Sequence, residues 1–345
     1  LGTNIAGSTW TMVNSNLVGS LIFAGDLIST NAGGTAGTKA LVINGPGNTL
    51  FTGNIISNGY SPITITDNSS GRLTLSGSNV ITTLTINGTP NSVVDIGSGY
   101  LSLENLGGQT IYSTQGGVIT GTGKIRLSTL DSNATTGNNY ADNYIAAGKT
   151  LVINPEITGR GGFEMWSGSG TFVFNGINTF ESHIVIGPNY GTIVCSKIGN
   201  RGSTTSNLGQ GTNFIFSGAY SKLVYTGVGE NSNRQLIFNN HCFLDQSGTG
   251  NLAFTASPSL SSGGKNVTLM GSTAGTGEFS AALVNSSGTL TLYKAGTGTW
   301  RLSTNNTYSG ATIVNGGTLG LTGTYGAIPS SAATLAGGTL LLDNT

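Results

Sequence analysis

The chain has 345 residues, of which 57 are Gly and 7 are Pro, and charged residues make up only 8 %, against about 25 % in an average globular protein. Lys plus Arg number 13 and Asp plus Glu number 13, so the formal net charge is zero. This balance excludes the basic surface of a nucleic-acid-binding protein and the polybasic face that anionic lipids attract. The hydrophobic fraction of 37 % is patterned along the chain, which predicts a folded core.

Short runs with strand character follow one another from end to end. Helical patterns are nearly absent, and Gly recurs every few residues, which disfavours helices. Each run is bounded by Gly, Asn, Ser or Asp, the residues that favour turns. In chain order the predicted strands are Ser20–Ala24, Ala40–Ile43, Ile63–Thr66, Arg72–Leu75, Thr83–Ile86, Leu151–Ile153, Thr171–Phe174, Ile184–Ile186, Asn213–Phe216, Lys222–Tyr225, Gln235–Phe238, Asn266–Met270, Thr289–Tyr293, Thr299–Leu302, Thr312–Val314 and Thr339–Leu342.

One long segment, Asp131–Gly148, interrupts this rhythm with the sequence DSNATTGNNYADNYIAAG. We expect a loop insertion here, because no strand alternation is evident in it. A solvated corner is one interpretation. The other is a recognition loop, since long loops on a rigid scaffold carry binding residues. In that case Asp131, Tyr140, Asp142 and Tyr144 would make the contacts, with the two tyrosine rings as stacking faces for a glycan or a neighbouring subunit.

Internal repetition favours a solenoid over the other all-β architectures. GSGTFVFNGINTF (168–180) aligns without a gap to GTGTWRLSTNNTY (296–308), and an Ile-Val pair follows each segment. In this alignment Phe172 and Trp300 occupy the same place, which we interpret as one stacked inner position. The repeats are long and imperfect, so they indicate an irregular array of similar turns whose sequences have diverged.

Residues 296–321, GTGTWRLSTNNTYSGATIVNGGTLGL, resemble the autotransporter-associated β-strand repeat of bacterial secreted passenger domains. The preceding GEFSAALVNSSGTLTLYKAGTGTW (277–300) is similar to the segment that leads into that repeat. The resemblance implies a right-handed parallel β-helix. It also implies export across a bacterial outer membrane to the cell surface or the extracellular space.

The physical chemistry of the strands independently favours a parallel β-helix. Each turn would contribute two or three short strands that pair with the turns above and below, about 4.8 Å away. At roughly 20 to 25 residues per turn, the chain would form about 15 turns. In the repeat we expect Ile313 to face inward and Thr312 and Val314 to face outward. We predict one continuous right-handed β-helix over residues 1–345, itself an excerpt of a longer chain.

The chemistry-bearing residues do not form a recognisable catalytic or metal-binding constellation. Cys195 and Cys242 lack a C-x-x-C spacing, so they form either a disulfide or two buried thiols. His183 is interpreted as a surface or edge residue of a strand, and His241 precedes Cys242, with which it could form a Cys/His pair only if both side chains shared one site. The acids are scattered, and no calcium-binding nonapeptide of the G-G-x-G-x-D type occurs. We expect no catalytic residues, no metal and no cofactor.

The sequence therefore predicts a non-enzymatic structural protein, secreted or at the outer cell surface. It would serve as a β-helical stalk or as a subunit of an extracellular filament or sheath. Its partners would be copies of itself or the rest of a longer β-helix, and its charge balance argues against nucleic acid. We expect no membrane insertion, because no unbroken run of about 18 apolar residues is present. The alternatives are an adhesin passenger that binds host or matrix glycans through its loops and a polysaccharide-active enzyme. An ice-binding Thr array is disfavoured by the irregular spacing of its Thr-x-Thr pairs.

Overall fold

The computed structural model describes residues 7–29, 37–57, 61–104, 108–127, 140–329 and 333–343. All regular secondary structure within these ranges is β-strand. The chain divides into two compact units, Leu1–Ser182 (unit 1) and His183–Thr345 (unit 2).

Unit 1 consists of three parallel sheets, and successive strands of the chain enter the first, second and third sheet in turn. The first sheet contains β1 (Thr9–Val13), β4 (Lys39–Asn44), β7 (Ile63–Asp67), β10 (Thr83–Ile86), β13 (Gln109–Ser113), β16 (Tyr140–Ile145) and β19 (Gly162–Ser167). The second contains β2 (Ser20–Phe23), β5 (Asn48–Phe51), β8 (Arg72–Leu75), β11 (Val93–Asp95), β14 (Gly117–Thr120), β17 (Thr150–Ile153) and β20 (Thr171–Phe174). The third contains β3 (Leu27–Ile28), β6 (Ile55–Ile56), β9 (Asn79–Ile81), β12 (Tyr100–Leu103), β15 (Lys124–Leu127) and β18 (Glu156–Gly159).

Unit 2 also has three parallel sheets. The first contains β21 (Ile184–Ile186), β23 (Asn213–Phe216), β26 (Gln235–Phe238) and β29 (Ser259–Leu260). The second contains β22 (Thr192–Cys195), β24 (Ser221–Tyr225), β27 (Cys242–Gln246), β30 (Gly263–Gly271), β32 (Gly288–Lys294), β34 (Thr312–Val314) and β36 (Ala333–Leu335). The third contains β25 (Glu230–Ser232), β28 (Leu252–Phe254), β31 (Thr276–Phe279), β33 (Thr299–Leu302), β35 (Thr318–Thr322) and β37 (Thr339–Asp343).

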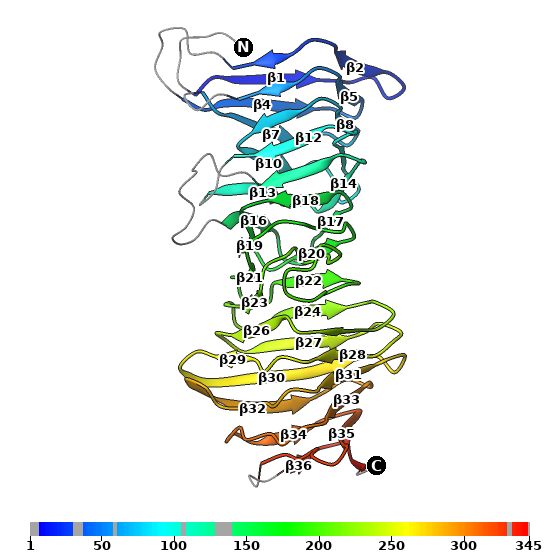
Figure 1. Cartoon of the computed structure of the whole chain (residues 1–345). Coiled ribbons are helices and arrows are strands. Elements are labelled where there is room, and N and C mark those ends of the chain that lie inside the picture. Colours follow the sequence, from blue (N-terminus) through cyan, green and yellow to red (C-terminus); the bar gives the residue numbers. More distant parts are fainter. Residues whose placement is uncertain are drawn as a thin grey trace. The chain divides into compact units, whose positions relative to one another are not determined.

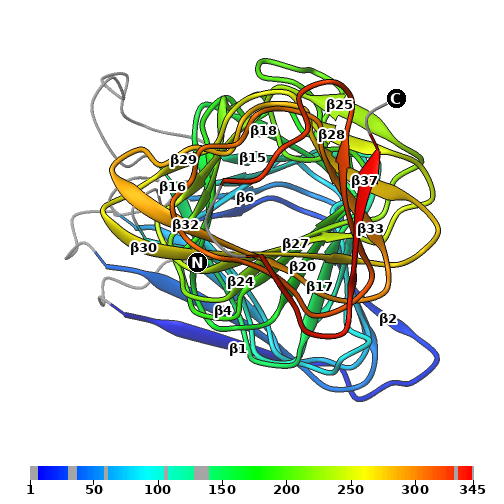
Figure 2. The same cartoon turned by 90° about the horizontal axis from the view of Figure 1, so that it is seen from below.

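The core of each unit is a set of apolar columns, because equivalent inward residues of successive turns lie in register. In the second sheet of unit 1, one such column joins Leu73, Val94, Ile119, Ile153 and Phe174, all essentially buried. Burying each of these side chains contributes roughly 1.5–3 kcal/mol. Figure 1 shows the strands of unit 1 following one another from blue to green, and Figure 2 looks along the stack at the interior that the sheets enclose. The predicted parallel β-helix is confirmed.

The register also shows where the repeat is interrupted. Val94 pairs with Ile119, and in unit 2 Leu223 pairs with Leu244; both spacings agree with the predicted turn length. In contrast, Ile119 pairs with Ile153, a partner that lies clearly further along the chain. The additional residues of this longer turn lie between β14 and β17, in the part of the chain that contains β15 of the third sheet and β16 of the first sheet. In unit 2 a similar insertion lies between β22 and its pairing partner β24, since Cys195 pairs with Tyr225.

The sixteen strands predicted from the sequence are all present, but two finer predictions are wrong. Thr312 and Val314 face inward and Ile313 faces outward, the reverse of the prediction. The hydroxyl of Thr312 can be buried because it shares a 2.6 Å hydrogen bond with the buried Tyr308 hydroxyl. Phe172 and Trp300 are both buried, yet they lie on β20 of a second sheet and β33 of a third sheet, so they are not one stacked position.

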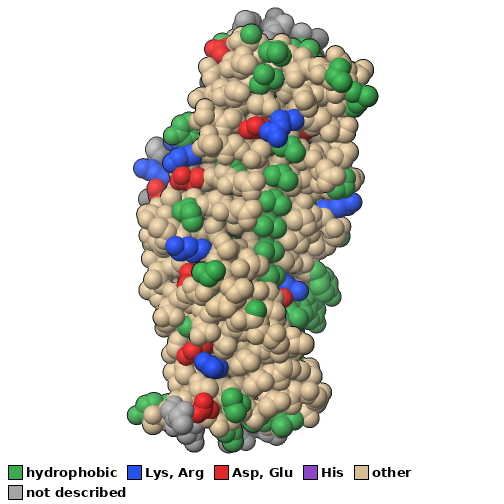
Figure 3. Space-filling model, turned by 90° about the vertical axis from the view of Figure 1, so that its right-hand side faces the viewer, with side chains coloured by type: hydrophobic (Ala, Val, Ile, Leu, Met, Phe, Trp, Pro, Cys, Tyr) green, Lys and Arg blue, Asp and Glu red, His purple; other side chains and the backbone are tan. Residues whose placement is uncertain are grey.

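The visible surface consists mainly of uncharged polar groups. Figure 3 shows a predominantly tan face on which the few red and blue side chains lie mostly beside one another. Two ion pairs occur among the described residues, Arg72 with Asp95 and Lys124 with Glu156. The few charges of the chain are therefore partly neutralised by neighbouring charges. Charged side chains that have no such partner are candidates for ligand binding.

Candidate functional site

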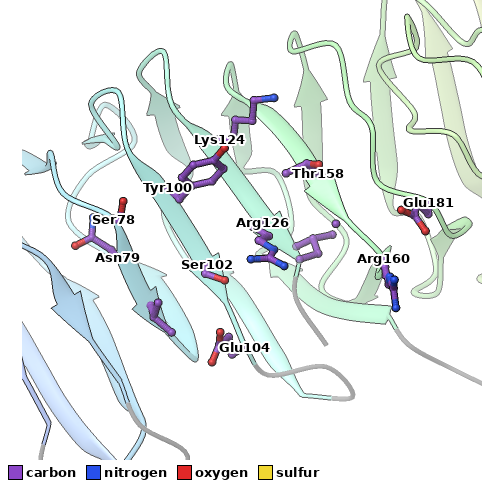
Figure 4. A pocket seen from close by; sticks show the side chains of 13 residues that line it. Ser78, Asn79, Tyr100, Ser102, Glu104, Lys124, Arg126, Thr158, Arg160 and Glu181 are labelled. Atoms are coloured by element: carbon purple, nitrogen blue, oxygen red, sulfur yellow. The ribbon is translucent and has the colours of Figure 1, made fainter. Parts of the chain in front are cut away.

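The third sheet of unit 1 is hollowed on its outer side. In the register of this sheet Ser102 lies between Val80 and Arg126, and Arg126 lies opposite Thr158. The short side chains of Ser102 and Thr158 leave a groove across β9, β12, β15 and β18, with a volume of about 760 Å³ (Figure 4). A groove of this volume is within the range of small-molecule and oligosaccharide-sized binding sites.

Charged side chains surround the groove. The Nζ of Lys124 lies 2.9 Å from Oε2 of Glu156, and this hydrogen bond raises the pKa of Lys124. Burial raises the pKa of Glu104, an effect that the positive charge of Arg126 opposes. Arg126 and Arg160 are exposed, and within the described ranges neither takes part in an ion pair. The groove thus offers guanidinium groups that are available to a ligand.

The first sheet of unit 1 contains three of the four residues predicted to make binding contacts. Tyr140, Asp142 and Tyr144 lie on β16, so this part of the segment 131–148 is a strand and the prediction of a loop is wrong for it. The three side chains alternate with buried residues and share the outer face of the strand. Asp131 lies outside the described residues.

Neighbouring strands add aromatic and acidic groups to this outer face. Tyr112 of β13 lies opposite Tyr144, and the two rings stack with centroids 4.2 Å apart. Asp142 lies opposite Glu164 of β19. Burial, followed by the negative charge of Asp142, raises the pKa of Glu164 to about 7. We call this surface the tyrosine face; it consists of Tyr112, Tyr140, Asp142, Tyr144, Glu164 and Trp166.

Two irregularities of register flank β16. On one side Thr110 is the extra residue of β13, and its hydroxyl donates a 2.9 Å hydrogen bond to Oδ1 of the buried Asn143. On the other side the register of β19 shifts at Trp166, whose side chain is 60 % exposed. Asn143 Nδ2 in turn donates to the carbonyl of Glu164, 3.1 Å away. β-Bulges redirect side chains, and here they place an exposed indole beside a tyrosine stack.

The groove and the tyrosine face meet at the corner between the third and first sheets of unit 1. Glu181, which lines the groove, donates its backbone N–H to the carbonyl of Gly159 at 2.9 Å. Burial raises the pKa of Tyr140, and the next residue, Ser182, acts on the hydroxyl of this tyrosine in the opposite direction. Arg160, between β18 and β19, lines the same end of the groove (Figure 4). Together these surfaces provide guanidinium, carboxylate, hydroxyl and aromatic groups, the set that recognises hydroxylated and acidic ligands.

The two cysteines of unit 2 are buried, free thiols, so the second of the two interpretations applies and the disulfide prediction does not hold. Cys195 pairs with Tyr225 at the end of β24, whereas Cys242 pairs with Ser221 at its start. That offset alone is about 13 Å along the strand, well beyond the span of a disulfide. Burial raises the pKa of both thiols, which disfavours the reactive thiolate.

The contacts of the two histidines are those of structural residues. His241 accepts a 2.8 Å hydrogen bond at Nδ1 from the backbone N–H of Asn266, and its ring lies 5.5 Å from that of Tyr220. Burial and the charge of Arg234 lower the pKa of His183. The described residues contain no group of three or more His, Cys, Asp and Glu side chains arranged to hold a metal ion. Nor do they include a helix long and apolar enough to span a membrane.

The segment 196–211 between β22 and β23 is fixed from the inside by Arg234. This side chain is fully buried, and its guanidinium donates to the carbonyls of Gly209 at 2.6 Å, Leu208 at 3.3 Å and Gly211. Glu230 accepts hydrogen bonds from the N–H groups at the start of the same segment, at 2.6 and 2.9 Å. The segment 196–211 is therefore an insertion built around a buried cation.

The comparison with protein families agrees with the resemblance seen in the sequence. Residues 292–321 match the family model of the passenger-associated-transport-repeat, and they extend from β32 into β35 of unit 2. No curated protein and no solved structure matches the chain. Within the matched segment Trp300 faces the core, with its ring 5.8 Å from that of Phe279. The chain therefore carries a repeat of the autotransporter passenger type, folded as part of a parallel β-helix.

Proposed function

We propose that this chain is a non-enzymatic part of a bacterial passenger, exported to the outer cell surface, where it acts as a rigid β-helical stalk. The observation that carries the proposal is the passenger-associated-transport-repeat at residues 292–321 within a stack of parallel turns. In such a stack each turn contacts only its neighbours, so length can be added without changing the core. A surface with few charges, covered by Ser, Thr and Asn, is compatible with packing against further copies in a filament or sheath.

Surface accessibility tests this proposal. Antibodies against the purified chain should label intact source cells, and protease added to intact cells should remove the label. Labelling that appears only after lysis would refute the surface location. Negative-stain microscopy of the purified chain separates the two structural roles, because a stalk gives short rods and a filament subunit gives long fibres.

A second function, adhesion through glycan binding, is supported by the groove and the tyrosine face of unit 1. Their arginines, carboxylates and exposed rings are groups that hydrogen-bond sugar hydroxyls and stack on sugar rings. Adhesion and a stalk role are compatible, since a rigid scaffold commonly presents the binding surface. A polysaccharide-active enzyme is tested by measuring turnover of acidic and neutral polysaccharides with and without calcium, and we expect none.

A further inference from the structure

We propose that the groove of unit 1 binds the carboxylate groups of an acidic polysaccharide through Arg126 and Arg160. This inference deepens the adhesion function proposed above and rests on it for its biological meaning. It names the ligand class and the residues that would select it.

The two arginines at the groove differ in their surroundings from Arg72 and Arg234. Arg126 has Ser102 and Thr158 as its neighbours in register, and neither is long enough to cover it. Arg126 and Arg160 are exposed at the groove. In contrast, Arg72 is engaged by Asp95 at 2.7 Å and Arg234 is enclosed by carbonyls. Among the described residues neither guanidinium takes part in an ion pair, and a planar guanidinium binds a carboxylate in the bidentate geometry that lysine cannot offer.

The extent of the groove suits an elongated ligand. It crosses four successive strands of the third sheet, β9, β12, β15 and β18, so it runs along the stack of turns. Three interstrand steps correspond to about 14 Å. This length suits a short stretch of an extended chain lying along the stack, and the volume of about 760 Å³ is sufficient to hold it.

Acidic and aromatic side chains lie beside the arginines of the groove. Glu104 and Glu181 line the groove as well, so a continuous polyphosphate or polysulfate would meet like charges. Carboxylate oxygens accept hydrogen bonds from hydroxyl groups, and sugars supply those donors. Tyr100, 48 % exposed, provides an aromatic face beside the groove. A ligand that alternates carboxylates with hydroxyls on ring faces, as a polymer of uronic acids does, matches this arrangement.

Lys124 has a different role in this proposal. Its charge is already compensated by Glu156, with 2.9 Å between Nζ and Oε2. The pair forms part of the same outer surface as Tyr100, which lies opposite Lys124 in register (Figure 4). We assign the Lys124–Glu156 pair a structural role at that side of the groove. The carboxylates of the ligand would be bound by Arg126 and Arg160.

The test is affinity electrophoresis of the whole chain through gels containing polygalacturonate, with neutral dextran and dextran sulfate as comparison polymers, in calcium-free buffer. The binding variant is the double substitution R126Q/R160Q. The matched control is R72Q/R201Q, which removes the same charge from two exposed arginines outside the groove. Far-UV circular dichroism and the urea midpoint of each protein establish that it is folded.

We expect polygalacturonate to retard the wild type and R72Q/R201Q equally, and dextran to retard neither. Affinity should fall by about tenfold or more in R126Q/R160Q, because each lost guanidinium–carboxylate contact is a charged hydrogen bond. Absence of retardation by polygalacturonate, equal loss in the control variant, or equally strong retardation by dextran sulfate would overturn the inference. If intact cells display the chain but polygalacturonate does not bind, the ligand assignment fails and the passenger function stands. If polygalacturonate binds the chain but the chain is found only inside cells, the ligand assignment stands and the passenger function fails.

Discussion

Replacing Arg234 by Met tests whether a buried cation organises the insertion of unit 2. Methionine keeps much of the side-chain volume but removes the donors to the carbonyls of Gly209, Gly211 and Leu208. Each buried acceptor left without a donor costs about 1–3 kcal/mol. Part of that cost is recovered, because burial disfavours the guanidinium and lowers the pKa of Arg234 to about 10. We expect a net destabilisation of about 3–5 kcal/mol, the usual effect of removing one member of a buried charged network.

Urea unfolding followed by tryptophan fluorescence measures the global effect, and limited trypsin digestion measures the local one. Lys197 and Arg201 are exposed in the insertion, so loosening of the segment should accelerate cleavage after them. Arg72→Met is the control, because its ion pair with Asp95 is exposed and contributes less than about 1 kcal/mol. If R234M were as stable and as resistant to trypsin as R72M, the segment would be held by its own turns and the proposed role of Arg234 would be wrong.

Three further predictions concern single side chains. Burial raises the pKa of Glu164 to about 7, so its stabilising contribution relative to E164Q is complete below about pH 4.5 and lost as pH rises to about 7; after solvent screening we expect a change of about 1–2 kcal/mol in urea unfolding measured across that range. Burial also raises the pKa of Asp67, whose Oδ2 is buried without a partner, so the stability of the wild type relative to D67N should be highest in acid and fall as pH rises through the folded pKa, and a difference independent of pH would contradict this. In Gly277→Ala the new Cβ would lie 2.4 Å from the Trp300 ring, and we expect a loss of about 1–3 kcal/mol in thermal or urea unfolding, with no comparable loss for Gly25→Ala, where a Cβ meets nothing within 4 Å.

The strands could be predicted because their alternation is strong and their boundaries are marked by turn residues. Arg72–Leu75 and Thr83–Ile86 illustrate this, since each alternates polar with apolar residues and has Gly71 or Asn87 beside it. The direction in which a strand faces was harder to predict where both sides are apolar. In Thr312–Val314 the hydrogen bond between the hydroxyls of Thr312 and Tyr308 makes a threonine acceptable inside, and no local pattern encodes that partner.

The tyrosine face was only partly predictable for a similar reason. β16 did not resemble a strand because one of its inward positions is the amide Asn143 rather than an apolar residue. That amide is satisfied by Thr110 and by the backbone of β19, partners that only the folded register supplies. Glu164 and Trp166 were missed, although their alternation with the buried Phe163 and Met165 was a usable signal. The groove draws on residues from four turns, so its composition depends on turn lengths that the sequence does not fix locally.

The position of these surfaces follows from a general property of solenoids. A regular repeat presents the same outer side chains on every turn, so it offers an extended surface but no unique place for a ligand. A specific site requires a departure from the repeat, and in unit 1 the register shifts lie on both sides of β16, on the lengthened turn between Ile119 and Ile153. The groove borders the same turn through Arg160 and Glu181. We therefore expect ligand recognition at the irregular turns of the repeat. The regular turns on either side supply the rigidity that holds the binding surface in place.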